Sequence, residues 1–377
     1  MLYYTLLGIL IFTTLFELVY YWVYLDAVNR RIHRSRKVQS PKERDLPMVS
    51  VIICARNEGQ NLRSFLQMVL SQDYPNYEVI VVDDESEDDT RLVIEQYQRR
   101  YSHLRSTYVP HNARIRSSKK LAITLAAKAA KGDYLLLTDA DCVPNGRQWV
   151  REMVAGFTPG TEVVLGFGAY IKERTLLNRL IQYDTLFNGL QYMGMAIMGH
   201  PYMGVGRNLA YSKDLFFREN GFAGLLGFRA GDDDLFVNKV AQKRNTQVVV
   251  SKESITWSLP KQTFREWLQQ KRRHLSVSPN YKSRTKWLLV SEPMVRGLFY
   301  GLLLLLCFLP CSWLWLAGGI CFLLRLLSQV CVIDRSAHHF SLPCFSIGFV
   351  LFDIYLPLNN LLLMLLNTFN RKQIRQW

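Results

Sequence analysis

Paired cysteine spacing, of the kind that binds metal or builds a disulfide framework, is missing from this chain. None of its seven cysteines forms a CxxC pair, and five stand in apolar carboxy-terminal stretches, at Cys307, Cys311, Cys321, Cys331 and Cys344. This spacing excludes a zinc ribbon and a small disulfide-stapled scaffold. Reduced, buried thiols are typical of a protein that faces the cytosol.

The marks of a cleaved signal peptide are also missing, because no basic n-region and no small-residue cleavage site accompany the apolar amino terminus. Residues 2–25 contain one charged residue, Glu17. A helix that rises about 1.5 Å per residue crosses a hydrocarbon layer of roughly 30 Å over this length. We therefore predict a retained transmembrane anchor over residues 1–28.

Basic residues follow the anchor within the segment RRIHRSRK, at Arg30, Arg31, Arg34, Arg36 and Lys37. Basic flanks mark the cytoplasmic side of a span, so we predict a basic linker over residues 29–47 on that side. Beside a membrane such an arm suits anionic lipid headgroups better than nucleic acid. We expect an integral protein of a bacterial inner membrane, with its soluble part facing the cytoplasm and no nucleic-acid partner.

Strand and helix patterns alternate through the soluble part of the chain. The predicted strands are 49–54, 77–84, 106–109 and 133–139, and helical spacing covers the segments between them, at 59–72, 88–101 and 119–132. This alternation predicts an α/β fold with a doubly wound, mainly parallel sheet. In such sheets ligands bind beyond the carboxyl ends of the strands.

Two carboxylates, Asp139 and Asp141, directly follow a run of apolar strand residues. Alternate side chains of an extended chain share a face, so both carboxylates point the same way. A divalent cation shared with a phosphate-bearing ligand would turn their repulsion into attraction. A solvated loop is the plainer interpretation of an isolated DxD. Acidic residues also follow the first two strands, at Glu58 and Asp83-Asp84, and this convergence favours a ligand site.

Long apolar stretches return after Pro293 and are interrupted at Pro310. They are too long for one span, so we predict a hairpin of two transmembrane helices over residues 293–333. A further apolar stretch, 344–368, holds several polar residues and is either a third span or a re-entrant, interfacial element. We favour the second alternative, because it keeps the basic tail at 371–375 in the cytoplasm.

Residues from about 48 to 280 resemble the processive and lipid-linked members of family 2 glycosyltransferases, which have a GT-A fold. The motifs stand in the family's order: VSVIICARNEGQNL (49–62), VVDDESEDDT (81–90), SSKKLAIT (117–124), TDADC (138–142), AGDDDLFVNKVAQK (230–243) and WLQQKRRH (267–274). Membrane segments flank this region in many members. The resemblance implies a GT-A catalytic domain over 48–280, ending in an interfacial helix, and glycosyltransferase activity.

The resemblance also implies which side chains bind a nucleotide-sugar donor. Glu58 would accept hydrogen bonds from a uracil or ribose. Asp83 would contact the base, and Asp84 would lie near the ribose. Lys119 or Lys120 would place a positive charge near the sugar–phosphate, and the other lysine would be solvated.

The same resemblance implies a metal cofactor, Mg²⁺ or Mn²⁺. Asp141 would ligate the ion directly, and Asp139 would contact the ribose or the ion. The ion would bridge the diphosphate and stabilise the charge that builds on the departing nucleotide.

Two further motifs are similar to the family's base and acceptor segments. Asp232 or Asp233 would accept the proton of the acceptor hydroxyl; alignment on the following Asp-Leu favours Asp232, but adjacent aspartates leave the register open. An acidic helix cap is the alternative. Within GVGRNLAYSKD (204–214), Gly206, Arg207 and Asn208 would bend the backbone close to the acceptor sugar.

The last motif, Gln270, Arg273 and His274, departs from the family's QxxRW. Gln270 and Arg273 belong to the expected donor site, and Arg273 can hold a diphosphate bidentately. His274 stands where synthases have the tryptophan that stacks beneath the acceptor sugar, which puts polymerisation in doubt. A basic helix on the membrane surface is the alternative. The Met- and aromatic-rich block 175–204 is either plain core or the lining of a lipid entry.

These motifs predict an inverting, metal-dependent transferase that moves a sugar from a nucleotide diphosphate, expected to be uridine-based, to a hydroxyl of a membrane lipid or lipid-linked glycan. A processive polysaccharide synthase is the alternative, although few carboxy-terminal segments are available for a polymer channel. A membrane-tethered nucleotidyltransferase would need a glycine-rich loop, and the first turn has only Gly59. A non-catalytic nucleotide-sugar sensor would keep the pocket without a base.

Overall fold

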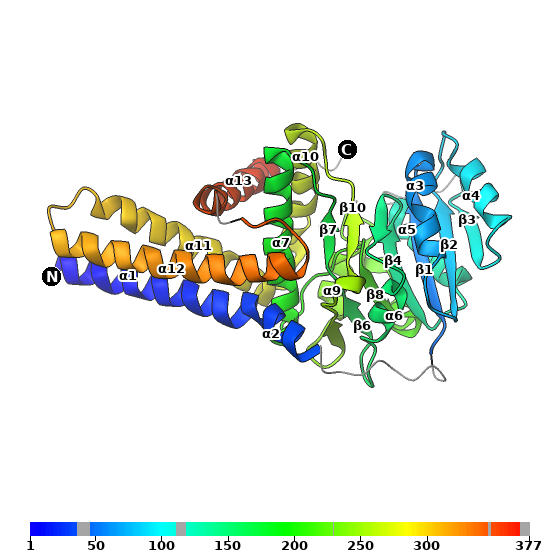
Figure 1. The fold of residues 1–377 in the computed structure, drawn as a ribbon, viewed down its shortest axis with the longest axis horizontal. Helices are drawn as coiled ribbons and strands as arrows, with labels where there is room; N and C mark the ends of the chain where they lie inside the picture. The colour runs from blue at the N-terminus through cyan, green and yellow to red at the C-terminus, as the bar shows by residue number, and fades with distance from the viewer. Residues whose placement is uncertain (36–45, 111–117, 229, 346–347, 370–377) are drawn as a thin grey trace.

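The structure, a computed structural model, describes residues 1–35, 46–110, 118–228, 230–345 and 348–369. Figure 1 shows an α/β domain and a bundle of long apolar helices that extends from it. Helix α7 (Leu176–Ile197) stands between the two parts. The predicted basic residues Arg36 and Lys37, and the basic tail 371–375, lie outside the described residues.

The main sheet has seven strands in the order β3-β2-β1-β4-β8-β6-β9. Only β8 runs antiparallel to its neighbours, β4 and β6, so the predicted doubly wound, mainly parallel sheet is confirmed. The strands are β1 (Val49–Ala55), β2 (Tyr77–Asp83), β3 (Leu104–Tyr108), β4 (Tyr134–Asp139), β6 (Val163–Leu165), β8 (Leu209–Ser212) and β9 (Thr246–Val248).

Helices cover both faces of this sheet. Successive side chains of a strand point to opposite faces, so the apolar side chains on both faces need cover. In β1, Val51 and Ile53 belong to the core under α3 (Gly59–Leu70), α4 (Thr90–Gln98) and α6 (Trp149–Val154). Ile52, between them, belongs to the opposite core, which includes α5 (Ser118–Ala129), α7 and α9 (Asp234–Val240). The two cores hold the carboxyl ends of the strands at one edge.

A second sheet of three short strands was not predicted. Its strands, in the order β5-β10-β7, are β5 (Cys142–Pro144), β10 (Thr256–Ser258) and β7 (Gly168–Tyr170). Three-residue strands are too short for a period of two to stand out in a sequence. Strand β4 ends at Asp139 and β5 begins directly after Asp141, so the two sheets hold the chain on both sides of the DxD.

Four helices in the described part of the chain are long and apolar enough to cross a membrane, one amino-terminal and three carboxy-terminal. The first is continuous from α1 (Leu2–Val19) through a π-helical turn, η1 (Tyr20–Leu25), into α2 (Asp26–Ser35). The others are α11 (Ser283–Leu306), α12 (Ser312–His339) and α13 (Phe349–Phe369).

Two sequence-based boundaries fall inside continuous helices. Residues 29–35 of the predicted basic linker belong to α2, because Ala27, Val28 and Ile32 are buried on one face of that helix. The predicted hairpin begins at Pro293, inside a helix, since α11 starts at Ser283 and continues through this proline. Apolar helices tolerate an internal proline where neighbouring groups satisfy the freed backbone.

Helix α13 is placed differently from the other apolar helices. In Figure 1, α1, α11 and α12 run alongside one another, whereas α13 lies beside α7 and α10 (Phe264–Leu275). Helix α10 is fastened there by Lys271, whose Nζ is 2.7 Å from Asp184 Oδ1 of α7. Asn367 of α13 accepts a hydrogen bond from Arg272 Nε at 2.8 Å. Lys271 and Arg272 are therefore docking residues and not just a solvated basic face.

The helical part of the 175–204 block is mostly core. Tyr183, Leu186, Leu190 and Met193 of α7 are no more than 1% exposed. Gly194 brings α7 close to the anchor, because a Cβ at this position would stand 2.0 Å from the Tyr24 carbonyl oxygen. Of the two alternatives for this block, core packing fits these side chains.

Candidate active site

The carboxyl ends of β1, β2 and β4 meet at one edge of the main sheet. In the strand register, Cys54 stands opposite Asp139, and Ala55 stands opposite Asp83. Sheet topology therefore brings together acidic residues that are more than fifty positions apart in the sequence. This edge is where doubly wound sheets bind their ligands.

Two loops at this edge brace each other. Asn57, at the end of β1, adopts a φ of 56°, and the next two backbone amides donate to side chains of the β2–α4 loop. Glu58 N donates to Thr90 Oγ1 at 2.9 Å, and Gly59 N donates to Asp88 Oδ2 at 3.0 Å. A Cβ on Gly59 would meet an Asp89 side-chain oxygen at 2.0 Å, so a larger residue here would require that side chain to move.

The acidic side chains expected to bind the nucleoside lie on these loops. Glu58 accepts from Asn61 Nδ2 at 2.5 Å, and burial raises the pKa of its carboxyl group. Asp83 accepts from Ser86 N at 3.1 Å. Asp84 is 6% exposed, and among the described residues nothing donates to its buried Oδ1. That oxygen is an acceptor available to a ligand.

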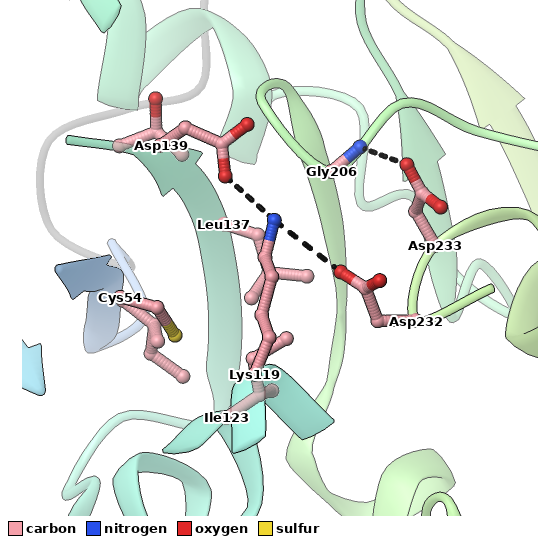
Figure 2. Close-up of a pocket in the computed structure, with 10 residues that line it drawn as sticks. Cys54, Lys119, Ile123, Leu137, Asp139, Gly206, Asp232 and Asp233 are labelled. Atoms are coloured by element: carbon pink, nitrogen blue, oxygen red, sulfur yellow. Dashed lines mark hydrogen bonds and ion pairs between the residues drawn. The ribbon is translucent and has the colours of Figure 1, made fainter. Parts of the chain in front are cut away.

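A pocket beside these loops contains the most charged part of the site. Figure 2 shows Lys119 of α5 between Asp139 of β4 and Asp232. Its Nζ lies 2.7 Å from Asp139 Oδ1 and 3.4 Å from Asp232 Oδ2. Burial opposes the ammonium charge, but the two carboxylates outweigh burial and raise the pKa of Lys119. The lysine links the DxD to the acidic motif.

Asp139 and Asp141 fit a divalent cation. Their carboxylate oxygens and Cys142 Sγ lie within 4.8 Å of one another. Burial and the charge of Asp139 raise the pKa of Asp141, and the positive charges of Arg207 and Lys261 offset this only in part. Cys142 is buried against Ser258 Oγ at 2.9 Å, and burial raises the pKa of its thiol. A neutral thiol is a poor ligand, so two carboxylates remain for a hard cation.

The three consecutive aspartates have different surroundings. Asp233 accepts from Gly206 N at 2.7 Å and from Asp234 N at 2.8 Å, and Asp234 accepts from Tyr281 OH at 2.7 Å and Leu235 N at 2.7 Å. Asp232 contacts Lys119 instead, and both Asp232 and Asp233 line the pocket (Figure 2). Geometry thus distinguishes side chains that the sequence alone leaves equivalent.

Lys120 is placed differently from our expectation. It is fully buried, and its Nζ donates to the carbonyl oxygens of Phe228 at 2.5 Å and Ala230 at 2.8 Å. The prediction that one of the two lysines is solvated is wrong for Lys120. Consecutive helical residues point about 100° apart, so Lys119 enters the pocket while Lys120 fastens the loop before Asp232.

The expected acceptor segment lies beside the pocket, but its three residues are not equivalent. Gly206 lines the pocket. The Arg207 guanidinium stacks 4.3 Å from the Tyr170 ring centre and donates to Gly168 O at 2.7 Å. Asn208 is fully buried and bonds to Trp149 Nε1 at 3.0 Å and to two backbone carbonyls. All its side-chain atoms are used inside the core, so we do not retain Asn208 as an acceptor contact.

The α10 motif lies at the same edge. Gln270 Nε2 donates to Tyr170 OH at 3.1 Å. Arg273 is exposed and acts electrostatically on Asp139. The protein around His274, together with Arg273 and Arg207, lowers the pKa of its imidazole to about 4. The residue is exposed, so its ring is accessible to stack on or hydrogen-bond a sugar.

Tyr170 and Tyr281 are site residues that sequence reasoning missed. Tyr170 contacts both Arg207 and Gln270, and so joins two expected motifs. Tyr281 bonds to Asp234 from the segment before α11. Each stands alone among ordinary core or loop residues, and no spacing in the sequence connects either of them to a motif.

Comparison with known proteins identifies the family. The model of Glycosyl transferase family 2 matches residues 50–217, and that of Glycosyl transferase family group 2 matches residues 134–366, more than half of the chain. This chain belongs to the family 2 glycosyltransferases. Both matches include the DxD, and the second includes the acidic motif, α10 and the carboxy-terminal helices.

Individual relatives agree with this assignment. Glycosyltransferase AglE of Haloferax volcanii is 34% identical over 181 residues, which are 46% of this chain and 54% of that protein. A hyaluronan synthase of Streptococcus pyogenes is 26% identical over 210 residues, 52% of this chain and 49% of the synthase. The chain spans about half the length of these curated relatives.

A solved structure confirms the GT-A fold. Mannosyltransferase PcManGT from Pyrobaculum calidifontis, in complex with GDP-Man and Mn²⁺, superposes with a TM-score of 0.57. The alignment covers 89% of this chain and 99% of the mannosyltransferase at 20% identity. At that identity the likeness concerns the fold alone.

Proposed function

We propose that this family 2 glycosyltransferase moves a sugar from a nucleoside diphosphate donor to a hydroxyl of a membrane lipid or lipid-linked glycan, with inversion at the anomeric carbon. The observation that carries the proposal is the pocket in which Lys119 contacts both Asp139 and Asp232. In this pocket Asp139 is one carboxylate of the proposed metal site, and the Lys119 ammonium can bind phosphate. Asp232 is a separate carboxylate that can accept a proton.

Asp139 and Asp141 are the residues that would hold Mg²⁺ or Mn²⁺, and such an ion would neutralise the charge of the departing nucleotide. Lys119 stands beside Asp139, where its ammonium can donate to the same phosphates. Arg273 of α10 adds a second positive charge near Asp139. These cations bind the diphosphate end of the donor.

The nucleoside end of the donor would bind along Glu58, Asp83 and Asp84. Their acceptor oxygens suit the N–H of a base and the hydroxyls of a ribose. The unpartnered Oδ1 of Asp84 supports this placement. We propose a uridine nucleotide, and guanosine is the competing choice because the similar mannosyltransferase binds GDP-Man.

Asp232 would remove the proton of the acceptor hydroxyl. Its carboxylate contacts Lys119 in the pocket. Asp233 also lines the pocket, but Asp233 and Asp234 each accept two hydrogen bonds. One base acting on one incoming hydroxyl implies a single displacement, and therefore inversion.

A membrane-borne acceptor is supported by the position of α10, which carries His274 and packs against α13 beside the apolar helices. We propose that α13 lies in the interface and that the catalytic domain faces the cytoplasm, next to the basic face of α2. Single transfer is favoured because His274 replaces the tryptophan of QxxRW. Processive synthesis stays the alternative, since a hyaluronan synthase is among the relatives.

The test is a donor screen with the full-length chain purified in detergent. UDP- and GDP-sugars are supplied with and without Mn²⁺, and a native lipid extract is then added. We expect one UDP-sugar to be consumed with Mn²⁺, and one sugar to appear per lipid. Long glycan made from donor alone would support the synthase alternative. Donor binding without any transfer or hydrolysis would support a sensor and overturn the proposal.

A further inference from the structure

The proposed base, Asp232, lies in a loop and depends on its neighbours for its orientation. Helix α9 begins two residues later at Asp234. Tyr281 donates to Asp234 Oδ2 at 2.7 Å, and both side chains are buried, at 7% and 5% exposure. A carboxylate buried this deeply needs a strong donor. The hydroxyl of Tyr281 meets that need from outside the α/β domain.

A second contact joins the same two elements one helical turn later. Lys282 N donates to Asn238 Oδ1 at 3.0 Å. Asp234 and Asn238 are four residues apart and therefore lie on one face of α9. Tyr281 and Lys282 directly precede Ser283, where the apolar helix α11 begins. The start of a candidate membrane span is thus attached to the helix that follows the catalytic motif.

The attachment extends to the amino-terminal anchor. The Tyr281 and Tyr202 rings meet edge to face, with centres 6.1 Å apart. Tyr202 OH donates to Gln191 Oε1 at 3.2 Å, and Gln191 Nε2 donates to Tyr20 OH at 2.7 Å. Tyr20 belongs to the π-helical turn η1. A buried polar chain therefore connects the anchor, α7 and the first turn of α9.

We propose that Tyr281 is a positioning residue for sugar transfer: by holding Asp234, it sets the register in which Asp232 faces Lys119, and it fastens the base to membrane helix α11. This inference rests on the proposed function. Removing the hydroxyl leaves Asp234 Oδ2 without its donor, so the first turn of α9 rearranges to find another. A displacement of about 1 Å at a reacting group lowers rates by roughly 100-fold.

Because the proposed donor site lies away from Tyr281, a positioning role for this residue predicts a specific kinetic pattern. Glu58, Asp84 and Asp141 bind the donor from the strand ends, and none of them contacts Tyr281. Loss of the Tyr281 hydroxyl should therefore lower kcat and leave donor binding intact. If Tyr281 had a purely structural role, loss of its hydroxyl would lower stability and the amount of active protein, without separating kcat from donor binding.

The experiment compares Y281F with Y300F in the full-length chain in lipid nanodiscs. Tyr300 is a matched control, because it also donates from α11 to a buried aspartate, Asp353, at 2.7 Å, but lies in the apolar bundle. For Y281F we expect kcat to fall about 10- to 100-fold, with the donor KM and the affinity for UDP within about twofold of wild type. For Y300F we expect kcat to change by less than about twofold.

A double-mutant cycle tests whether Tyr281 acts through Asp234. D234A should lower kcat as Y281F does, and the double variant should be no slower than the slower single variant. Additive losses, or a Y281F kcat within twofold of wild type, would overturn the inference. So would a structure of Y281F in which Asp232 still contacts Lys119, and this readout needs no activity. If wild type transfers no sugar, the proposed function fails instead.

Discussion

At the scale of single residues, the acidic motif shows how identical side chains acquire different roles. Asp232, Asp233 and Asp234 are adjacent, yet the chain changes direction between them as α9 begins. Burial and the neighbouring Asp232 raise the pKa of Asp233 to about 6, and burial with Asp233 raises that of Asp234 to about 7. Hydrogen bonds within the fold compensate for the burial of each of these two carboxylates.

The first prediction separates the base from its neighbour. Asp232→Asn should lower kcat by roughly 10²- to 10⁴-fold, the usual contribution of a general base, while the affinity for UDP is kept. Asp233→Asn should mainly lower the melting temperature, because its oxygens accept from Gly206 N and Asp234 N. Steady-state kinetics and thermal unfolding of both variants decide this. The opposite pattern would make Asp233 the base.

The second prediction concerns the cation. EDTA should abolish transfer, and added Mn²⁺ should restore it. Asp141→Asn should raise the Mn²⁺ concentration for half-maximal activity by about tenfold or more, because one of two protein carboxylates is lost. Asp214→Asn, on the exposed side of α8 (Lys213–Arg218), is the control and should not change it. Full activity in EDTA would show that the acidic pair has another role.

At the scale of elements, the first turn of α5 does two things at once. Lys119 reaches the pocket, and Lys120 reaches the carbonyls of Phe228 and Ala230 just before the acidic motif. Burial lowers the pKa of Lys120, and the three aspartates act in the opposite direction. One short helix therefore positions both the lysine proposed to bind the donor phosphates and the loop of the proposed base.

The third prediction uses this division of roles. Lys120→Met should lower the free energy of unfolding by about 1–3 kcal/mol, because two buried carbonyls lose a charged donor, and kcat should fall with it. Lys119→Met should weaken UDP binding and leave the melting temperature near that of wild type, since its side chain is 40% exposed. Equal stability of the two variants would contradict the assignment.

At the scale of the whole molecule, buried charges join the apolar helices. Arg325 of α12 lies 3.3 Å from Glu17 of α1 and 2.8 Å from Asp353 of α13. Arg296 of α11 lies 3.1 Å from the same aspartate and also pairs with Glu292. Charged residues in apolar helices are expensive unless they are paired. Their pairing places α13 against the bundle.

The fourth prediction tests this network. Arg325→Met leaves Glu17 and Asp353 buried without that partner, so the protein should lose about 3–5 kcal/mol of stability. The exposed pair of Arg91 and Glu95 is the control, and Arg91→Ala should cost no more than about 0.5 kcal/mol. Thermal unfolding in the same detergent measures both. A melting temperature for Arg325→Met equal to that of Arg91→Ala would mean the pairs contribute little.

Local patterns were sufficient for much of this description. Strands β1, β2 and β4 and helices α3 and α5 were predicted within a few residues, because each has an apolar period of its own. The family resemblance placed the DxD, the acidic motif and the α10 motif in order. The amino-terminal helix and the hairpin around Pro310 were visible as long apolar runs.

By itself, the sequence determined the elements with a strong internal period, the family and the residue types of the site. Only the tertiary structure decided which aspartate contacts Lys119, that Lys120 and Asn208 are bonded inside the core, and that Tyr170 and Tyr281 join separate motifs. Periodicity is a property of neighbours along the chain, whereas these roles depend on partners brought close by folding. Tyr281 and Asp234 are 47 positions apart, and no local pattern contains that contact.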